Sequence, residues 1–322
     1  MARYLVKRDK SAMIHDPVEI RQLRYFLAIA EAGSFSRAAD HLGISQPSIS
    51  QQMREVEARL RVTLFQRRGK RILLTAAGLV FQEHARSLLR QFEIFLQEVS
   101  SGPEQLHGTL LLGVVPILDT ALVPHLLGGF AARYPSISVS VEEVSSTEIE
   151  TAVEEGRMDL GLGFITHHSP NLRYERLCTD EFALIVPEVH PWWKRQVIDL
   201  SEIHQQRLVQ LPDSFVTRRM TDEICRKHQV RPKTIAEISA IQTLLRSLAP
   251  LKAAALMPKI ALLGTPGLKL KAIRLRGKNL KLEIGLLRLK GSAGNSTVEA
   301  FGQLAHAVVP KIVKKPNNTT KL

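Results

Sequence analysis

Hydroxyl, amide and guanidinium side chains gather between Ser45 and Arg54, where their spacing could read DNA. Apolar residues at positions 49, 53, 56 and 60 recur every three or four residues, which predicts a helix with a buried stripe and a polar opposite face. An amide can pair with adenine through two hydrogen bonds, whereas hydroxyls and a helix N-terminus suit phosphate oxygens. The predicted DNA-contacting residues of this helix are Ser45, Gln46, Pro47, Ser48, Ser50, Gln51 and Arg54.

Further basic residues follow at the tip of a predicted β-hairpin. Two short apolar runs, 62–65 and 72–74, flank a basic segment with a single glycine, which is typical of a hairpin. Ser36 and Arg37 open the preceding short helix and are predicted to contact phosphates. The alternatives are simple capping for these two residues and a solvated basic turn for the hairpin. The hairpin residues predicted to reach the DNA backbone or minor groove are Arg67, Arg68, Lys70 and Arg71.

The elements that would hold these residues form a predicted winged helix-turn-helix over residues 18–75. Apolar positions 23, 26, 27 and 30 predict a first helix, which Gly33 would end, and Ser34 is a good cap for the next helix. The helix-turn-helix itself is expected at about 35–54. Residues 1–17 are polar and of mixed charge, and they are predicted to be a flexible lead.

A long helix is predicted from Thr75 to about Ser100, within a linker segment of residues 76–105. Its apolar residues are spaced alternately by four and three, a heptad pattern that favours a dimerising coiled coil. The alternative is a stripe that packs on the helix's own domain. The residues predicted to form the dimer seam are Phe81, Ala85, Leu88, Phe92, Phe95 and Val99.

From about residue 106 onward strands alternate with helices, which predicts an α/β fold with a parallel sheet covered on both faces. We expect two lobes within residues 106–313. The first would comprise about 106–177 and 290–313, and the second about 178–289. Residues 314–322 are predicted to be a disordered tail.

Charge and composition narrow the class of protein. The chain carries 44 Lys and Arg against 31 Asp and Glu, a net charge of +13, which is typical of nucleic-acid binding. The final 64 residues hold 13 of the basic residues and 2 of the acidic ones, and these are interpreted as surface lysines or as extra nonspecific attraction to DNA. No apolar run approaches the ~20 residues of a membrane span, and no signal peptide is visible. A cytoplasmic protein without a membrane partner is therefore expected.

Other chemistries find little support in the sequence. Two cysteines, Cys178 and Cys225, are too few for a disulfide scaffold or a four-thiolate metal site. Neither a Gly-rich phosphate loop, a nucleophile elbow nor histidines at metal-ligand spacing are found. We therefore expect no enzymatic activity, no metal and no cofactor.

Several segments resemble the LysR-type transcriptional regulators in order and spacing. The match is dense over the first ~90 residues and looser beyond them, at 133–135, 155–160 and 257–258. The resemblance implies a winged helix-turn-helix, a dimerising linker helix and two Rossmann-like lobes around an effector cleft, similar to periplasmic binding proteins and usually assembled as a tetramer. The segments that carry it are Ile20–Phe26, Gly33–Ala39, Leu42–Ser50, Leu64–Phe65 and Leu74–Gly78. Within the family the chain looks most like regulators of cyanate-utilisation operons, especially around Phe215–Arg218.

The effector site is expected where strands of the sheet end. Small ligands bind beyond the carboxyl ends of strands in open α/β sheets, where helix N-termini present amides to an anion. In the family the loops there face the cleft, with hydroxyl residues at the positions matched by Ser146 and Thr217. Capping of helices is an alternative role for Thr120 and Ser146. The predicted effector-binding residues are Pro116, Ile117, Thr120, Ser145, Ser146, Ser214, Phe215 and Thr217.

The chain departs from the family pattern in two places. Leu251 and Ala253 stand where relatives usually have glycines, so the backbone is expected to approach the cleft less closely and the pocket to differ in shape. Arg61 stands where the family generally has glycine, so the start of the hairpin is expected to differ.

The sequence therefore predicts a regulator that binds double-stranded operator DNA as a dimer or tetramer and responds to a small anionic co-inducer. The effector would shift the population of lobe arrangements, and so alter DNA bending and the access of RNA polymerase. Three alternatives remain open: a solute-binding protein with a vestigial N-terminal module, an α/β enzyme that uses the cleft, and a nonspecific nucleoid-type binder.

Overall fold

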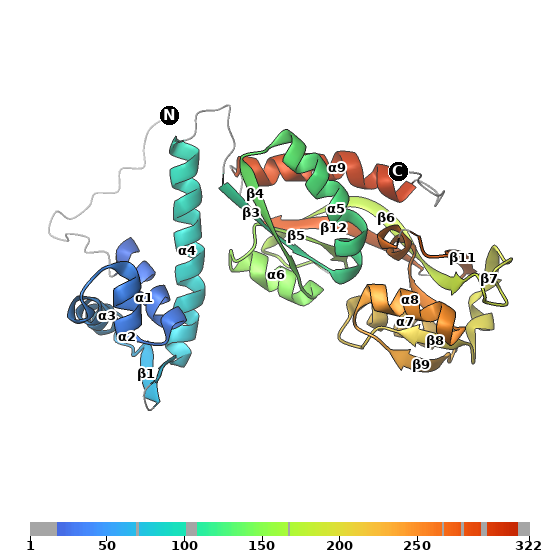
Figure 1. Ribbon diagram of the computed structural model, residues 1–322, viewed down its shortest axis with the longest axis horizontal. Coiled ribbons are helices and arrows are strands. Elements are labelled where there is room, and N and C mark those ends of the chain that lie inside the picture. Colours follow the sequence, from blue (N-terminus) through green and yellow to red (C-terminus); the bar gives the residue numbers. More distant parts are fainter. Residues whose placement is uncertain are drawn as a thin grey trace. The chain divides into compact units, whose positions relative to one another are not determined.

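A computed structural model describes residues 18–68, 71–100, 108–166, 168–265, 267–277, 280–290 and 295–314 (Figure 1). The chain divides into two compact units, 1–95 and 96–322. The predicted lead of residues 1–17 lies outside the described residues, as does the predicted tail except for Lys314. In the part of the chain that is described, no helix is both long and apolar enough to cross a membrane.

The first unit is a helical bundle with a two-stranded hairpin, as predicted. Ser34 caps the second helix through its side chain, and Gly33 and Gly43 take the left-handed backbone conformation that ends a helix. Its elements are α1 (Ile20–Ala32), α2 (Phe35–Leu42), α3 (Gln46–Leu60), β1 (Phe65–Arg68), β2 (Arg71–Leu74) and α4 (Ala76–Ser100). The helix-turn-helix formed by α2 and α3 follows the predicted boundaries closely.

Arg61 ends helix α3 at the position where the family generally has glycine. Its backbone adopts φ 56° and ψ 37°, the left-handed region in which glycine is strained least. The amide of Arg61 donates to the Glu57 carbonyl, so the helix still closes as it would with glycine. A non-glycine residue therefore holds this left-handed conformation at the end of α3, and a difference from the family at the start of the hairpin stays a prediction.

The first turns of α4 belong to the core of the first unit. The rings of Phe26 and Phe81 meet edge to face with centroids 4.6 Å apart, and Ala85 and Leu89 are buried in the same cluster. Thr75 begins the helix, because its hydroxyl accepts a hydrogen bond from the Gly78 amide at 3.0 Å. The stripe on α4 thus packs on its own domain over its first half.

The second unit holds two α/β lobes. Figure 1 shows β3, β4, β5 and β12 with α5, α6 and α9 in one lobe, and β8 and β9 with α7 and α8 in the other. The elements are β3 (Gly108–Val114), α5 (Pro116–Arg133), β4 (Ile137–Glu143), α6 (Ser146–Glu154), β5 (Leu160–Ile165), β6 (Leu172–Pro187), β7 (Val197–Asp199), η1 (Leu200–Ile203), β8 (Arg207–Gln210), α7 (Val216–Lys227), β9 (Lys233–Glu237), α8 (Ile241–Leu251), β10 (Ala255–Pro258), η2 (Lys259–Gly264), β11 (Leu270–Arg276), β12 (Lys281–Leu289) and α9 (Ser296–Lys314).

The main sheet is mixed, whereas the sequence predicted a parallel one. Its strand order is β4-β3-β5-β12-β6-β11-β7, with β10 also paired to β6, and β8 and β9 form a separate parallel pair. Strands β3, β4 and β5 are parallel, but β12 runs antiparallel to both β5 and β6. The strands at 197–199, 233–237 and 270–276 were not predicted, since each is short or interrupted by charged residues.

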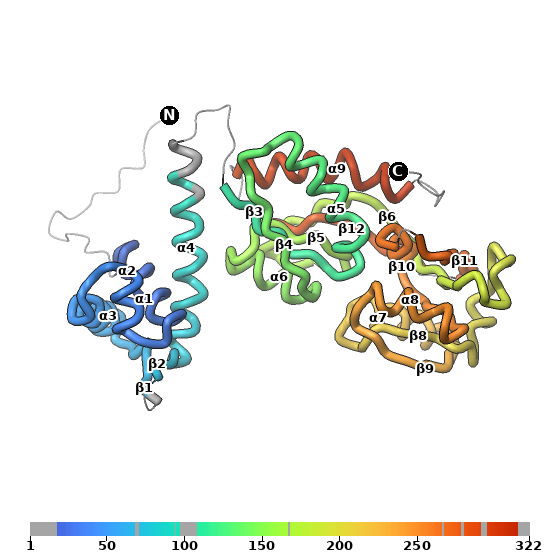
Figure 2. The backbone as a smooth tube through the Cα atoms, viewed as in Figure 1, coloured from blue at the N-terminus to red at the C-terminus, as the bar shows by residue number. Residues whose placement is uncertain are grey.

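One long strand, β6, passes through both lobes (Figure 2). Up to Glu181 it pairs with β12, and from Phe182 it pairs with β10 and β11. The return crossing lies beside it, because the Phe182 amide donates to the Leu280 carbonyl at 2.8 Å and Lys281 pairs with Glu181. The first lobe therefore comprises 108–181 and 281–314, and the second 182–280.

This division corrects the predicted lobes. The prediction assigned Leu280–Leu289 to the second lobe, but β12 pairs with β5 in the first. An apolar run of this kind identifies a buried strand without identifying its partner. Helix α9 packs on the first lobe as expected, with the Phe301 ring 5.2 Å from Phe130, and Arg288 of β12 pairs with Glu175 at 2.6 Å and with Glu299 of α9.

Candidate functional site

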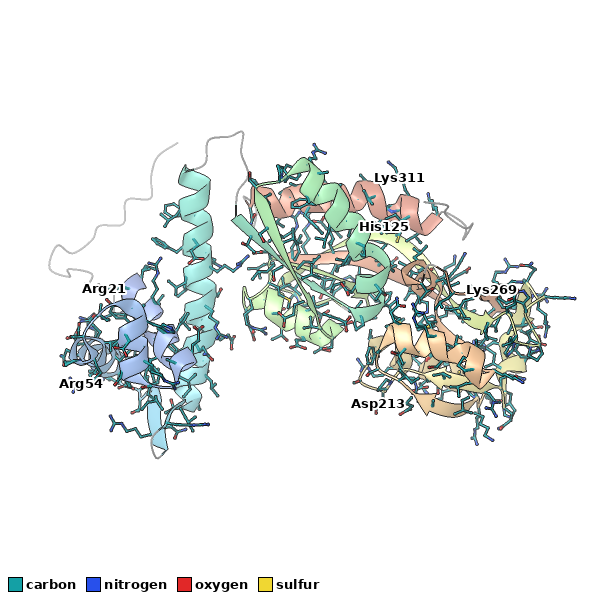
Figure 3. The ribbon with its side chains drawn as sticks, viewed as in Figure 1. Arg21, Arg54, His125, Asp213, Lys269 and Lys311 are labelled. Carbon is teal, nitrogen blue, oxygen red and sulfur yellow. The ribbon has the colours of Figure 1, made fainter. Side chains whose placement is uncertain are left out.

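The outer face of α3 presents the polar side chains that the sequence singled out. Among the seven predicted residues, Ser50 is half-buried and the other six are exposed, while Ile49, Met53 and Val56 are buried beneath them. Figure 3 shows Arg54 at the outer edge of the first unit. The helix thus buries its apolar stripe and leaves its polar face free for a ligand, as its periodicity predicts.

Hydrogen bonds along this face hold its side chains in order. The Gln46 amide donates to Ser50 Oγ at 2.9 Å, and the Arg54 guanidinium donates to Gln51 Oε1 at 3.0 Å. Ser45 accepts from the Ser48 amide at 3.3 Å, so its hydroxyl caps the helix. The side-chain amides of Gln46 and Gln51 each keep a further donor or acceptor. These side chains can therefore still contact base edges.

The two predicted phosphate contacts of α2 are both exposed, but they differ in their surroundings. Ser36 lies in the first turn, where Ser34 and not Ser36 caps the helix. The Arg37 guanidinium donates to the Ala32 carbonyl at the end of α1. Arg37 therefore also fastens α2 to α1, a role that its position in the sequence did not suggest.

The hairpin carries its arginines near the turn that joins its two strands. Strands β1 and β2 are antiparallel with Arg68 opposite Arg71, and both Arg67 and Arg71 are exposed. Lys70 lies outside the described residues. One Glu57 carboxylate oxygen accepts from the Leu64 and Phe65 amides at 2.7 and 3.3 Å, which fixes the hairpin against α3. Sequence reasoning missed Glu57, because its partner amides lie beyond the helix end.

The predicted dimer seam divides into two parts. Ala85 is 1% exposed and Phe81 is half-buried in the core of the first unit, so these two residues pack within the chain. Leu88 and Phe95 are about half exposed, and Phe92 is half-buried with its ring 6.2 Å from Phe95. Leu79, Val80 and Leu96 are exposed as well, although the heptad pattern did not include them. The side chain of Val99 lies outside the described residues.

A cleft of about 250 Å³ opens in the second unit where three helices begin. The first turns of α5 and α6 enter it from the first lobe, and the first turn of α7 enters it from the second. Seven of the eight predicted effector residues line it, namely Pro116, Ile117, Ser145, Ser146, Ser214, Phe215 and Thr217. The sequence thus located both sides of the cleft.

Thr120 is the exception and corrects the prediction. Thr120 does not line the cleft, and its hydroxyl donates to the Ile117 carbonyl at 3.3 Å within α5. The Thr120 side chain packs on η2, where a Cβ added to Gly264 would come within 2.9 Å of it. The cause is that α5 begins at Pro116 and not at Thr120, which places Thr120 one turn further along the helix.

Two features of the cleft favour an anion. The Ser146 hydroxyl is buried and has no hydrogen-bond partner among the described residues, although a buried polar group is normally paired. The N-cap residue of α7, Phe215, has no side chain that can accept from the first-turn amides. A helix N-terminus carries partial positive charge, so these donors suit a small anionic group.

Acidic side chains lie at the same cleft. Glu143 and Glu148 line it, and neither was predicted. Burial, with the Asp119 charge as a second cause, raises the pKa of Glu143. Burial alone raises the pKa of Asp119. Glu143 ends strand β4, and a polar residue at the carboxyl end of a strand was the signal that could have identified it. The apolar part of the lining, also missed, is Val115, Val144, Phe164 and Val216.

The departures from the family pattern at Leu251 and Ala253 lie outside the lining of the cleft. Neither residue lines it: Ala253 is fully buried in the core, and Leu251 packs against the same core. Lys252 between them takes φ 47°, a left-handed backbone conformation that favours glycine. The side chains of these two residues therefore do not narrow the cleft directly, and a difference in pocket shape from relatives stays a prediction.

Neither cysteine has the properties of a reactive thiolate. Burial raises the pKa of Cys178 and of Cys225 to about 11. In the described ranges no three His, Cys, Asp or Glu residues lie close enough together to hold a metal ion. The groups of the cleft that could interact with a small-molecule ligand are thus its hydroxyls, its carboxylates and the backbone amides at the starts of its helices.

Comparison with known proteins covers both units. A family model described as the LysR substrate binding domain matches residues 103–310, and one described as a bacterial regulatory helix-turn-helix protein of the lysR family matches residues 20–79. The probable RuBisCO transcriptional regulator of Porphyra purpurea is 32% identical over 71% of this chain and 74% of its own length. The hydrogen peroxide-inducible genes activator of Haemophilus influenzae is 25% identical over 76% of this chain and 82% of its own length.

Solved structures share the fold. Full-length OxyR from Pseudomonas aeruginosa has a TM-score of 0.72 at 21% identity, over 89% of this chain and 94% of that chain. Full-length CbnR in complex with its target DNA has a TM-score of 0.67 at 23% identity, over 90% of this chain and 99% of that chain. The helix-turn-helix unit and the two-lobed unit thus occur together in known proteins.

Proposed function

Since the chain belongs to the LysR family of transcriptional regulators, we propose that its α3 face and hairpin arginines bind an operator and that a small anion in the cleft controls this binding. As a family member it is a regulator and not an enzyme, and it joins a DNA-binding module to a domain for a small-molecule effector and forms oligomers. We assign it to the cytoplasm, where a regulator meets its DNA.

Residues of α3 would read the operator. Gln46 and Gln51 carry amides that can pair with base edges, and Arg54 lies one turn further along the same exposed face. The hairpin arginines would contact phosphates and contribute affinity without base specificity. The exposed part of α4, with Leu88 and Phe95, would join two copies, and paired copies favour an operator with dyad symmetry.

The observation that carries the anionic effector is the buried, unpartnered hydroxyl of Ser146. An unpaired buried polar group costs about 1–3 kcal/mol, so a ligand that supplies an acceptor recovers part of that cost. The first turn of α7 would bind the same ligand from the opposite lobe. A ligand that contacts both lobes favours one lobe arrangement over others, and the proposed result is a change in DNA bending and in the access of RNA polymerase.

The test is a footprint of the DNA beside the protein's own gene, with and without small anions that include cyanate. We expect protection of a dyad-symmetric site and a change in the protected pattern with one anion. The Ser146→Ala variant should lose the anion response and keep its thermal stability, since it removes an unpaired hydroxyl. Ser145→Ala, at another cleft residue, is the comparison for stability: it removes the cap of α6, where Ser145 accepts from the Glu148 amide at 3.2 Å, and should cost about 1 kcal/mol of stability.

Two outcomes would refute the proposal. A footprint without any specific site would favour a solute-binding protein or a nonspecific DNA binder. An anion response that Ser146→Ala leaves intact would remove Ser146 from the effector site. Cyanate itself remains a prediction from the resemblance around Phe215–Arg218, and a response to another anion would replace it.

Peroxide is a second candidate signal, because relatives such as the activator from Haemophilus influenzae are named for it. The cysteines of this chain argue against it. A thiol reacts with peroxide as its thiolate, and burial raises the pKa of both thiols to about 11. We therefore propose ligand binding and not thiol oxidation as the signal.

A further inference from the structure

Four exposed cations lie on neighbouring segments at the end of the second lobe that lies away from the cleft. Arg207 and Lys233 begin the parallel strands β8 and β9 and are register partners. Arg231 lies two residues before β9, and Lys252 lies on the turn before β10. We call these four residues the basic edge. The cleft uses residues 214–217, which follow the opposite, carboxyl end of β8, so the two surfaces are separate.

Backbone hydrogen bonds fix the three segments of the basic edge to one another. The Gln205 amide donates to the Arg231 carbonyl at 2.9 Å, and the Lys233 amide donates to the Gln206 carbonyl at 2.8 Å. The Ala254 amide donates to the Arg207 carbonyl at 3.0 Å, which attaches the turn of Lys252 to β8. The cations therefore project from a rigid base and not from independent loops.

Each of the three segments contains a strained residue with a polar side chain. Gln205, Gln229 and Lys252 have φ of 60°, 55° and 47°, and all three are exposed. A left-handed conformation costs a non-glycine residue about 1–2 kcal/mol, and glycine would avoid the cost. The amides of Gln205 and Gln229 add two hydrogen-bond donor groups to the four cations of the basic edge.

Negative charge is absent from the basic edge. The segments 203–209, 228–234 and 249–255 contain no Asp or Glu, and none of the four cations forms an ion pair with a carboxylate in the part of the chain that the structure describes. The second lobe as a whole has 17 Lys and Arg against 7 Asp and Glu, whereas the first lobe has 9 against 13. The excess of basic over acidic residues in the second unit thus lies in this lobe.

We propose that the basic edge is a second DNA-contacting surface, which binds phosphates of the DNA backbone outside the part held by α3. Arginine, lysine and amide donors are the groups that contact phosphate oxygens, and they need no base sequence to do so. The segments of the edge contain neither Trp, Tyr nor Phe, the anchors that protein interfaces and base stacking use. The edge therefore suits a polyanion better than it suits a folded protein partner.

The inference rests on the operator binding proposed above and predicts a dependence on DNA length. Each phosphate that a cation neutralises contributes about 0.9 to the slope of log affinity against log salt concentration. Flanking DNA that reaches the edge should add about 2–4 units of slope. A duplex that covers only the operator should show no such increase in slope.

The test uses the full-length protein with four substitutions, Arg207→Gln, Arg231→Gln, Lys233→Gln and Lys252→Gln. The matched control, Lys194→Gln with Lys259→Gln, Lys281→Gln and Lys311→Gln, removes four exposed cations elsewhere in the same unit. Fluorescence anisotropy over a range of salt would compare an operator-length duplex with one extended by about 30 base pairs on each side. We expect the edge variant to lose about 2–4 units of slope on the long duplex only, and the control to lose less than one.

A photo-crosslinker provides a direct second measurement. Placed at position 233 it should label the flanking DNA, and placed at position 194 it should not. Equal salt slopes for the edge and control variants would refute the proposal, since only the general field of the lobe would then matter. So would a changed oligomeric state or a lost response to RNA polymerase with unchanged DNA slopes, because the edge would then bind protein. Loss of binding by both variants and the unmodified chain would instead refute the proposed operator binding.

Discussion

The rings of Phe26 in α1 and Phe81 in α4 meet edge to face with their centroids 4.6 Å apart. This contact makes the first turns of the linker helix part of the DNA-binding unit. The orientation of α3 is consequently tied to the direction of α4, so in the proposed dimer the pairing of two α4 helices would also set the spacing of two α3 helices on DNA.

Phe81 and Leu88 should therefore respond differently to truncation. Phe81→Ala removes a core ring and should lower the free energy of unfolding of the first unit by about 2–4 kcal/mol at every protein concentration. Leu88→Ala removes a side chain that is 53% exposed and should leave that unit intact while it weakens the dimer. Thermal melts and sedimentation at several concentrations separate the two effects. A dimer unaffected by Leu88→Ala together with Phe95→Ala would contradict the assigned seam.

Gln46 and Arg67 should affect DNA binding in different ways. Gln46→Ala should reduce discrimination between operator and mutated operator by ~1–3 kcal/mol if the amide reads a base. Arg67→Ala should weaken binding to all sequences and reduce the salt slope by about one unit, because it removes one phosphate contact. Competition binding at several salt concentrations measures both quantities. Unchanged affinity and footprint for both variants would exclude this surface.

Glu143 should make anion binding depend on pH. Because burial and the Asp119 charge raise its pKa, Glu143 takes up a proton at a higher pH than an ordinary carboxyl does. Its negative charge opposes an anion in the cleft, so affinity should rise as pH falls through the raised pKa. Glu143→Gln should bind the anion more tightly at neutral pH and lose this pH dependence, as titration calorimetry would measure. The same dependence in Glu143→Gln would assign it to another group, with Asp119→Asn as the next variant to measure.

Arg61→Gly should stabilise the first unit. Arg61 holds φ 56°, where glycine has no Cβ to clash, and the gain should be about 1 kcal/mol after the entropy of the unfolded glycine is counted. Arg61→Ala is the control, since it removes the same charge and keeps the strain. Urea unfolding measures both. Equal stability of the two variants would mean that the left-handed conformation costs little here.

Hydrogen peroxide should leave operator binding unchanged. With a pKa of about 11, roughly one thiol in ten thousand is ionised at pH 7, too few for rapid oxidation. The footprint before and after peroxide treatment tests this, alongside the variant Cys178→Ser with Cys225→Ser. A peroxide effect that this variant abolishes would restore thiol oxidation as the signal.

Local signals made most of the first unit predictable. Gly33, Ser34, Gly43 and Ser45 end or cap helices through their own backbone and side chains, so position in the sequence suffices to place them. Contacts between distant segments were not predictable in this way. The partner of β12, the burial of Ala85 and the hydrogen bonds of Glu57 to the hairpin depend on residues that periodicity does not connect.

The cleft shows the same limit on a smaller scale. Its two sides were predicted because strand ends and helix starts identify themselves, but Thr120 was misplaced by one helical turn when α5 began four residues early. The unpaired state of Ser146 could not be predicted at all, because it depends on what surrounds the hydroxyl and not on its neighbours in sequence.

The crossing between the lobes has a mechanical consequence. At Glu181–Phe182 and Leu280–Lys281 the connection is a ribbon of two hydrogen-bonded antiparallel strands, and not a pair of free loops. Such a ribbon is hydrogen-bonded across its width, and two-stranded ribbons accommodate larger twists than wide sheets do. The lobes should therefore respond to an effector with a small rotation and little separation. A rotation of this kind keeps the hydrogen bonds of the sheet and changes the direction in which the surfaces of the second lobe face.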